Sequence, residues 1–347
     1  MIKSLVNFIV IKEGKNQRDM SWDLKIGEIK HSYISDIDIW QAINHFYFHS
    51  QVTTSYKFGF FKSLLENLYN VNDELVLNYN YLFYSFTKIY WNLVVHHGLW
   101  QSNNRNQHSV IQRILETYSE KYAIPKQWSF DKLDNELQLK IVKAVKTNGK
   151  RYFIGAFYGD TNGLFYEFNL KAEHLKFNKP VYEFLQHHQR TLIQLTNYQL
   201  AKFLEKNNNV PHVDYLLTKV EVISRRSSLD KFYQIINKYE NNNCFYCSSK
   251  LKQRSVHLDH FIPWSFIQTD DLWNLVLSCQ RCNLQKSDKV AESNYLDHII
   301  KRNDILLDNL INEEEHYFEY YLAEKLITLY EYSRFNGYTG KWKPYSI

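Results

Sequence analysis

All four cysteines of the 347-residue chain lie in one short segment, residues 244–289, as two Cys-x-x-Cys pairs. They are Cys244, Cys247, Cys279 and Cys282. Each pair can offer two thiolates to one metal ion, and four thiolates have the ligand number and softness of a closed tetrahedral zinc site. Because no cysteine is left over, the spacing favours zinc in a reducing compartment over a disulfide scaffold. We therefore predict a structural zinc site and a cytoplasmic protein.

A strand expected between the two pairs carries three titratable side chains. Over residues 256–263 (VHLDHFIP), an extended backbone would place His257 and Asp259 on one face and His260 on the other. Pro263 would end the ladder, because proline has no backbone N–H to donate. Asp259 and His260 are therefore expected near the end of this strand.

The elements that follow would close a small cleft around that strand end. A loop over residues 264–271 leads into a second apolar strand over residues 272–278, with Asn274 near its start. The second cysteine pair then turns the chain into a helix that begins near Asn283. We expect the two strands to form a hairpin that meets this helix, with the metal-binding half-sites framing all three.

This order of residues resembles the HNH endonuclease family in its treble-clef, ββα-metal form. The matching pattern is Asp-His-x-x-Pro, then Asn-Leu, then Cys-x-x-Cys-Asn-x-x-Lys, and it occurs here at residues 259–263, 274–275 and 279–286. The family's last histidine is replaced by Asn283, which still supplies an oxygen ligand. The resemblance covers residues 244–289 and implies metal-dependent hydrolysis of DNA phosphodiester bonds, with a 5′ phosphate on the product.

Each matching residue type suits one part of this chemistry. A neutral imidazole can take a proton from the attacking water, and we assign that role to His260. Charge that gathers on the phosphate calls for a hard divalent cation with oxygen ligands. Asp259 and the amide oxygen of Asn283 are the expected ligands, for magnesium or manganese. In the resembled family the middle asparagine, here Asn274, ties down the loop between the strands and so orients the imidazole.

Five further residues are candidate nucleic-acid contacts. His257 is either a phosphate contact or a polar strand residue. Arg281 and Lys286 could meet backbone phosphates together with the helix N-terminus, or be solvated surface charges. Arg225 and Arg226 leave the same two interpretations open, in a basic helical stretch upstream.

The positive charge of the chain is concentrated around the cysteine segment. The net charge is only +5, yet residues 219–290 contain 11 Lys and Arg against 7 Asp and Glu, a local excess of +4. Such an excess attracts a polyanion.

Two other functions stay open. One is a zinc-dependent DNA or RNA adaptor that does not cut. The other is an RNase, because water activation and metal binding do not choose between DNA and RNA.

The rest of the chain is expected to be mainly helical. Apolar spacing predicts helices over residues 82–99, 130–146 and 180–204. Two aromatic runs, residues 151–158 and 164–170, are separated by Gly-Asp-Thr-Asn-Gly and predict a β-hairpin. Two more helices are expected over residues 295–311 and 313–332, and a first strand over residues 4–11.

We therefore predict a mainly α (α+β) protein with four parts. They are a helical N-terminal domain over residues 1–210, a basic helical connector over 211–243, the nuclease domain over 244–294 and C-terminal helices over 295–347. The N-terminal domain would supply target choice or control through a protein partner or an activating signal. Family analogy suggests prokaryotic defence or restriction as the context. No stretch approaches the roughly 18 apolar residues of a spanning helix, so we expect no membrane insertion.

Overall fold

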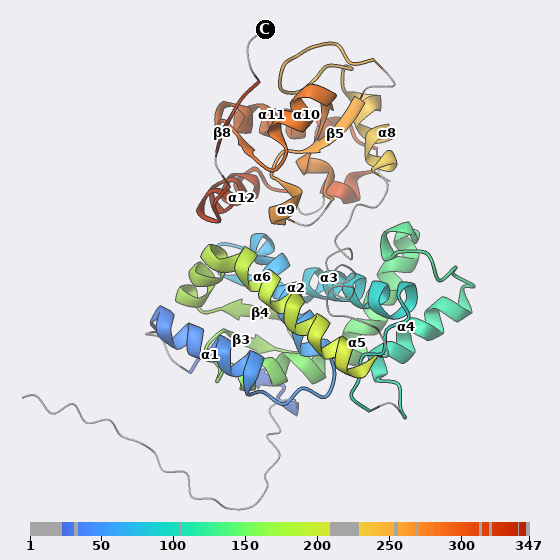
Figure 1. Ribbon diagram of the computed structural model, residues 1–347, viewed down its shortest axis with the longest axis vertical. Helices are drawn as coiled ribbons and strands as arrows, with labels where there is room; N and C mark the ends of the chain where they lie inside the picture. Colours follow the sequence, from blue (N-terminus) through green and yellow to red (C-terminus); the bar gives the residue numbers. More distant parts are fainter. Residues whose placement is uncertain are drawn as a thin grey trace, which may run out of the picture.

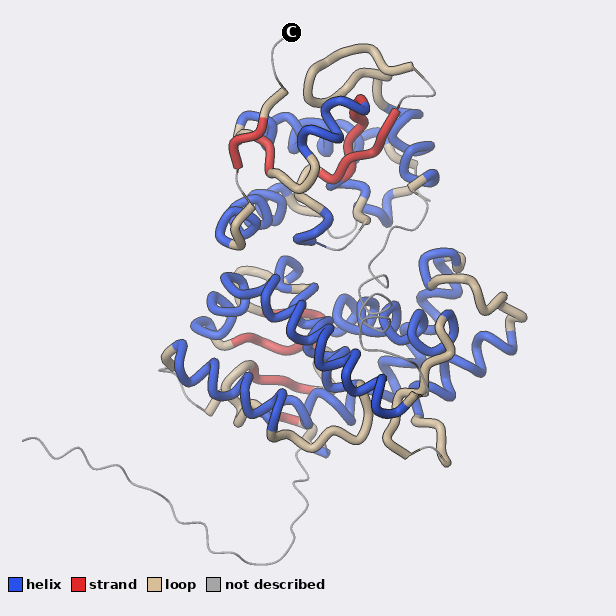
Figure 2. The backbone as a smooth tube through the Cα atoms, viewed as in Figure 1, coloured by secondary structure: helices blue, strands red, loops and turns tan. Residues whose placement is uncertain are grey.

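The computed structural model describes residues 23–30, 34–104, 106–208, 229–252, 256–267, 270–311, 314–318, 321–338 and 340–344. The expected strand over residues 4–11, together with Arg225 and Arg226, lies outside these ranges. Helices predominate and the sheets are small, as the mainly α prediction required (Figure 2). Within the described ranges, no helix combines the length and the apolar character that crossing a membrane would need.

Two separate hydrophobic cores organise the described chain, and the elements around them form two groups in Figure 1. The first lies within residues 23–208, here called the N-terminal region, and the second within residues 229–344, the C-terminal region. The C-terminal helices contribute to the second core along with the cysteine segment. The cysteine segment and the helices after it therefore share one hydrophobic core.

Six helices build the N-terminal region. They are α1 Asp36–Phe48, α2 Tyr56–Glu66, α3 Tyr79–Trp91, α4 Val110–Lys121, α5 Asn135–Asp160 and α6 Lys179–Asn207. Three short turns join them: η2 Leu68–Asn70, the π turn η3 Asn92–His96 and η4 Phe130–Lys132. Helix α2 packs against α3 and α6, while α5 packs against α3 and α4. Ser35 begins α1 by a reciprocal capping box with Asp38, which satisfies backbone N–H groups at the first turn.

A four-stranded sheet completes this region. Its strands are β1 Ile26–Gly27, β2 Val76–Asn78, β3 Tyr166–Asn169 and β4 His174–Phe177, in the order β1-β3-β4-β2. The hairpin β3–β4 replaces the predicted one, whose first strand over residues 151–158 is wrong because α5 continues to Asp160. Aromatic residues favour strands, but a run joined directly to an amphipathic helix extends that helix when its rings pack on the same buried face.

The C-terminal region combines short strands with helices. Its elements are α8 Asp230–Tyr239, β5 Val256–His260, α9 Trp264–Ile267, η6 Leu272–Asn274, β6 Leu275–Cys279, α10 Gln280–Lys286, β7 Val290–Ala291, α11 Asn294–Asn309, η7 Glu315–Phe318, α12 Ala323–Phe335 and β8 Gly340–Trp342. Strands β5 and β6 pair antiparallel, with His260 opposite Leu275, and α10 packs on both. The expected hairpin and helix are present, although β6 begins three residues later than predicted and α10 begins at Gln280.

Side chains of helix α11 hydrogen-bond to the backbone at the start of β6. The Arg302 guanidinium donates to the carbonyl oxygen of Leu275, and the Asn303 amide donates to the carbonyl oxygen of Trp273 at 2.9 Å. Both side chains satisfy backbone oxygens that the two-stranded ladder leaves unpaired. The turn that carries Asn274 is therefore fixed by the C-terminal helices.

The two regions touch along a seam made by α6 and η2 on one side and by η6 and α12 on the other. The rings of Tyr69 and Trp273 lie 6.3 Å apart, and the Asn336 amide donates to the carbonyl oxygen of Gln186 at 3.0 Å. The Arg190 guanidinium lies 4.9 Å from the ring centre of Tyr338. The turn η6, which carries Asn274, therefore lies at this seam.

Candidate functional site

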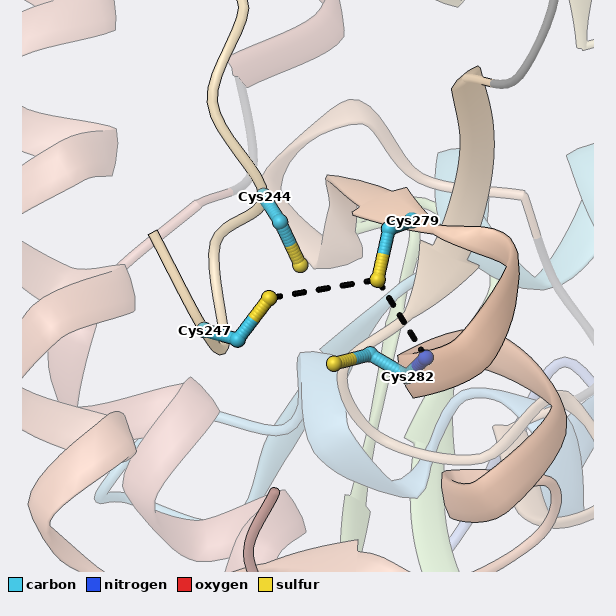
Figure 3. A group of neighbouring side chains, drawn as sticks. All are labelled: Cys244, Cys247, Cys279 and Cys282. Atoms are coloured by element: carbon cyan, nitrogen blue, oxygen red, sulfur yellow. Dashed lines mark hydrogen bonds between the residues drawn. The ribbon is translucent and has the colours of Figure 1, made fainter. Parts of the chain in front are cut away.

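The four cysteines converge as the sequence predicts. Cys244 and Cys247 lie in the turn before β5, Cys279 ends β6, and Cys282 is in the first turn of α10. Their sulfur atoms all lie within 4.8 Å of one another and point toward a common centre (Figure 3). The sulfurs of Cys247 and Cys279 are 3.9 Å apart. A tetrahedral ion with zinc–sulfur bonds of about 2.3 Å would separate its ligands by about 3.8 Å, so these residues fit zinc.

The thiols repel one another as they ionise. Burial raises the pKa of Cys244, and burial together with the nearby Cys244 raises that of Cys282. Burial also acts to raise the pKa of Cys247, but hydrogen bonds with Ser249, Cys244 and Cys282 together outweigh it and bring that pKa to about 7. A divalent cation would offset this repulsion and hold all four sulfurs as thiolates.

Asp259 is buried on β5 and faces α10. Its Oδ2 atom accepts a hydrogen bond from the Tyr246 hydroxyl at 2.5 Å and lies 2.9 Å from the Lys286 ammonium. Burial and the neighbouring Asp259 hold the pKa of Tyr246 well above its usual value, so the phenol stays a donor. Among the described residues, none is hydrogen-bonded to the other oxygen, Oδ1. Asp259 therefore retains one carboxylate oxygen for a further partner.

Lys286 has a different place from the expected surface contact. Its side chain is fully buried at the last turn of α10, and its ammonium donates to the carbonyl oxygen of His260 at 2.6 Å as well as pairing with Asp259. A buried ammonium needs such partners, because an unpaired charge inside a protein is costly. Lys286 thus joins the helix to the end of β5 instead of facing a phosphate.

Replacing Lys286 by methionine should destabilise the C-terminal region. Lys286→Met leaves the Asp259 carboxylate buried with only the Tyr246 hydroxyl, and breaking a buried pair costs about 3–5 kcal/mol in free energy of unfolding. Urea unfolding followed by tryptophan fluorescence measures the change. Lys289→Met alters an exposed lysine three residues later and should stay within about 0.5 kcal/mol. Equal changes in the two variants would refute this role for the buried pair.

His260, the predicted base, is 4% exposed at the end of β5. Its Nε2 atom lies 2.8 Å from Oδ1 of Asp270, a partner that sequence reasoning missed. No motif marks Asp270, which follows ten residues later in the loop after α9. Within the described ranges, nothing is hydrogen-bonded to Nδ1 of His260. The ring is therefore held through one nitrogen and offers the other.

Asn274 is fully buried and clamps the chain just after β5. Its Oδ1 atom accepts from the backbone N–H of Ile262 at 2.8 Å, and its amide donates to the carbonyl oxygen of the same residue at 3.0 Å. The backbone N–H of Phe261 also donates to the carbonyl oxygen of Asn274 at 2.8 Å. These contacts hold the backbone just after β5, and the role of Asn274 in orienting the imidazole stays a prediction.

Asn283 and Arg281 lie on α10, half-buried and exposed respectively. Asn283 is three residues before Lys286, so the two side chains lie on the same side of the helix. Lys286 forms an ion pair with Asp259, which places that side of the helix toward Asp259. In the part of the chain that the structure describes, the Asn283 amide has no hydrogen-bond partner. Asp259 Oδ1 and an amide oxygen are donors of the kind that magnesium and manganese prefer, so this donor set fits such an ion. His257 lies half-buried on β5.

Comparison with known proteins supports the family resemblance. Residues 244–289 match the model of the HNH endonuclease family. No curated protein and no solved structure matches the chain. The match points to a nuclease or nucleic-acid-binding function for the C-terminal region, and the cysteine cluster inside it points to bound zinc.

Proposed function

We propose that the C-terminal region, whose residues 244–289 match the HNH endonuclease family, hydrolyses phosphodiester bonds in DNA with a divalent metal. The observation that supports this most is the end of β5. There His260 keeps Nδ1 without a partner among the described residues, next to a carboxylate that keeps one free oxygen. A module that only binds would not require a base and an oxygen donor at adjacent positions.

His260 is the general base of this reaction. The attacking water gives its proton to Nδ1 as its oxygen bonds to phosphorus, and the bond to the 3′ oxygen breaks. The product strand then carries a 5′ phosphate. Asn274 keeps the backbone after β5 in place, so the imidazole stays at a fixed distance from the substrate.

Two metal sites serve different purposes in this proposal. The cysteines hold zinc, which fixes the turn before β5 to the start of α10. Asp259 Oδ1 and the Asn283 amide oxygen would hold magnesium or manganese, which supplies positive charge to the phosphate and the leaving oxygen when bound. Lys286 keeps the Asp259 carboxylate oriented toward α10.

The long N-terminal region requires a role of its own. We propose that it forms a domain that selects the target or controls the cut, because a small ββα unit contacts mainly the nucleic-acid backbone. A protein partner or an activating signal would act through it. By family analogy the setting is prokaryotic defence or restriction in the cytoplasm, a compartment that keeps thiols available to zinc.

Arg281→Ala should weaken DNA binding while leaving zinc in place. Arg281 is exposed in the first turn of α10, where a guanidinium can reach a backbone phosphate. Losing one phosphate contact reduces the slope of log binding constant against log salt by about 0.9. Fluorescence anisotropy of a labelled duplex over a salt series measures it, with Arg334→Ala on α12 as the control. An unchanged slope would remove Arg281 from the interface.

Matched DNA and RNA substrates test the proposed reaction. The full chain, purified with its zinc, is incubated with end-labelled DNA or RNA of one sequence in magnesium or manganese, with EDTA as the blank. We expect DNA to be cut only with the divalent metal. Cleavage of RNA alone would make the protein an RNase.

One observation favours the alternative of a zinc-dependent binding module. Lys286 already neutralises much of the Asp259 charge, which weakens the attraction of that carboxylate for a cation. Binding of DNA or RNA without cleavage, under any divalent metal, would support this alternative and overturn the proposed hydrolysis.

A further inference from the structure

Asp270 is a buried carboxylate to which the reaction above gives no role. It is the residue directly before Asp271, the N-cap of η6, and its side chain is only 8% exposed. Its Oδ1 atom lies 2.8 Å from Nε2 of His260. The Asp270 carboxylate therefore lies against Nε2 of His260, and Nδ1 is the nitrogen that the proposed reaction assigns to the water.

A carboxylate beside an imidazole decides which ring nitrogen carries the proton. An ionised carboxylate only accepts hydrogen bonds, so a neutral His260 must present N–H at Nε2 to make this contact. The lone pair is then on Nδ1. The same contact prevents the ring from turning over, while Lys286 fixes the backbone of the same residue through its carbonyl oxygen.

Two lysines, one from each region of the chain, act electrostatically on Asp270. They are Lys88 on α3 and Lys231 on α8. Lys88 also lies 3.0 Å from Asp131 of η4, within the N-terminal region. These ammonium groups offset the cost of burying the carboxylate.

We propose that Asp270 is the positioning residue of the base: it holds the His260 ring with Nε2 protonated and Nδ1 directed at the attacking water. This inference rests on the proposed function. It differs from the role of Asn274, which fixes the backbone after the strand, because Asp270 fixes the ring itself.

The kinetic test compares three variants of the full, zinc-loaded chain on plasmid DNA in magnesium. Asp270→Asn should lower kcat by about 10²- to 10⁴-fold, since loss of the carboxylate that orients a catalytic imidazole reaches that size in a serine protease. The KM for DNA should stay within about twofold. Asp270→Glu, which restores a carboxylate, should recover at least about tenfold over Asp270→Asn. Asp271→Asn, the adjacent carboxylate, should keep the wild-type kcat.

A spectroscopic test does not depend on cleavage. In protein labelled with ¹⁵N in the histidine rings, the His260 signals are those lost in His260→Ala. With the His260 ring in its neutral form, the wild-type spectrum should show a protonated Nε2 and an unprotonated Nδ1. Asp270→Asn should mix the two tautomers, whereas Asp271→Asn should not.

The outcomes separate the two proposals. Wild-type kcat in Asp270→Asn, or an unchanged ring spectrum, would overturn the positioning role even if His260→Ala is inactive. If the wild-type chain cuts no nucleic acid, the proposed function fails, and the ring spectrum still decides whether Asp270 sets the tautomer. Zinc content and the thermal midpoint show whether each variant is folded. If Asp270→Asn does not fold, Asp270→Glu still tests the proposal.

Discussion

His260→Ala is expected to lower the rate of DNA nicking by about 10²- to 10⁴-fold, the contribution of a well-placed general base. The imidazole lies at the end of β5, and its removal leaves the cysteine cluster and the Asn274 clamp untouched. Zinc content and DNA affinity should therefore stay close to wild type. Conversion of supercoiled plasmid to nicked circles, measured in single-turnover conditions with magnesium, gives the rate.

His298→Ala is the matched control, because it removes an exposed imidazole from α11 in the same region. It should nick DNA at the wild-type rate. If His260→Ala retained wild-type cleavage, the assignment of the base would be wrong. If both variants lost activity together, the loss would reflect the fold and not the chemistry.

Cys279→Ser is expected to release zinc and unfold much of the C-terminal region. Cys279 supplies one sulfur of the cluster, and the same sulfur caps α10 by accepting from the backbone N–H of Cys282. Structural zinc contributes about 10–16 kcal/mol to the folding of zinc-finger peptides, so loss of one ligand removes a large part of the local stability. The N-terminal region has its own core and should unfold in a separate transition.

Metal analysis and calorimetry measure this effect. Wild-type protein should hold one zinc per chain. Strong chelation should remove the calorimetric transition of the C-terminal region, and Cys279→Ser should lack this transition without a chelator. Ser293→Ala, an exposed serine at the start of α11, serves as the control and should keep the metal. A Cys279→Ser protein that stays folded, zinc-loaded and active would refute the structural zinc.

Local spacing was enough to predict the zinc half-sites and the frame around them. Two Cys-x-x-Cys pairs can bring four sulfurs together only if the strands between them pair, and the hairpin β5–β6 does this. The long helix α6 was also predictable, since its apolar spacing is regular and a proline begins it. Such features depend on residues that are close in sequence.

Contacts that depend on tertiary packing were not predictable. The burial of Lys286 follows from which side of α10 faces β5, and the pairing of Asp270 with His260 follows from how the residues just before η6 lie against the end of β5. Neither leaves a spacing signal in the sequence. The helical course of residues 151–158 was misjudged because aromatic propensity alone does not show that α5 continues through them.

Residues of the N-terminal region interact with residues next to the candidate site. Lys88 of α3 interacts with Asp270, and Tyr69 packs near Trp273, one residue before the Asn274 clamp. A change in the N-terminal region that moved α3 or η2 would therefore alter the surroundings of the base. If the proposed function holds, this seam would let the N-terminal region control the activity.

The most direct test of the account is whether nicks made by the zinc-loaded chain can be resealed. Supercoiled plasmid is treated with the full chain in magnesium, then with DNA ligase, which requires a 5′ phosphate beside a 3′ hydroxyl. We expect nicked circles with magnesium, none with EDTA, and closure of the nicks by ligase. Plasmid that is bound yet stays supercoiled with every divalent metal would contradict it.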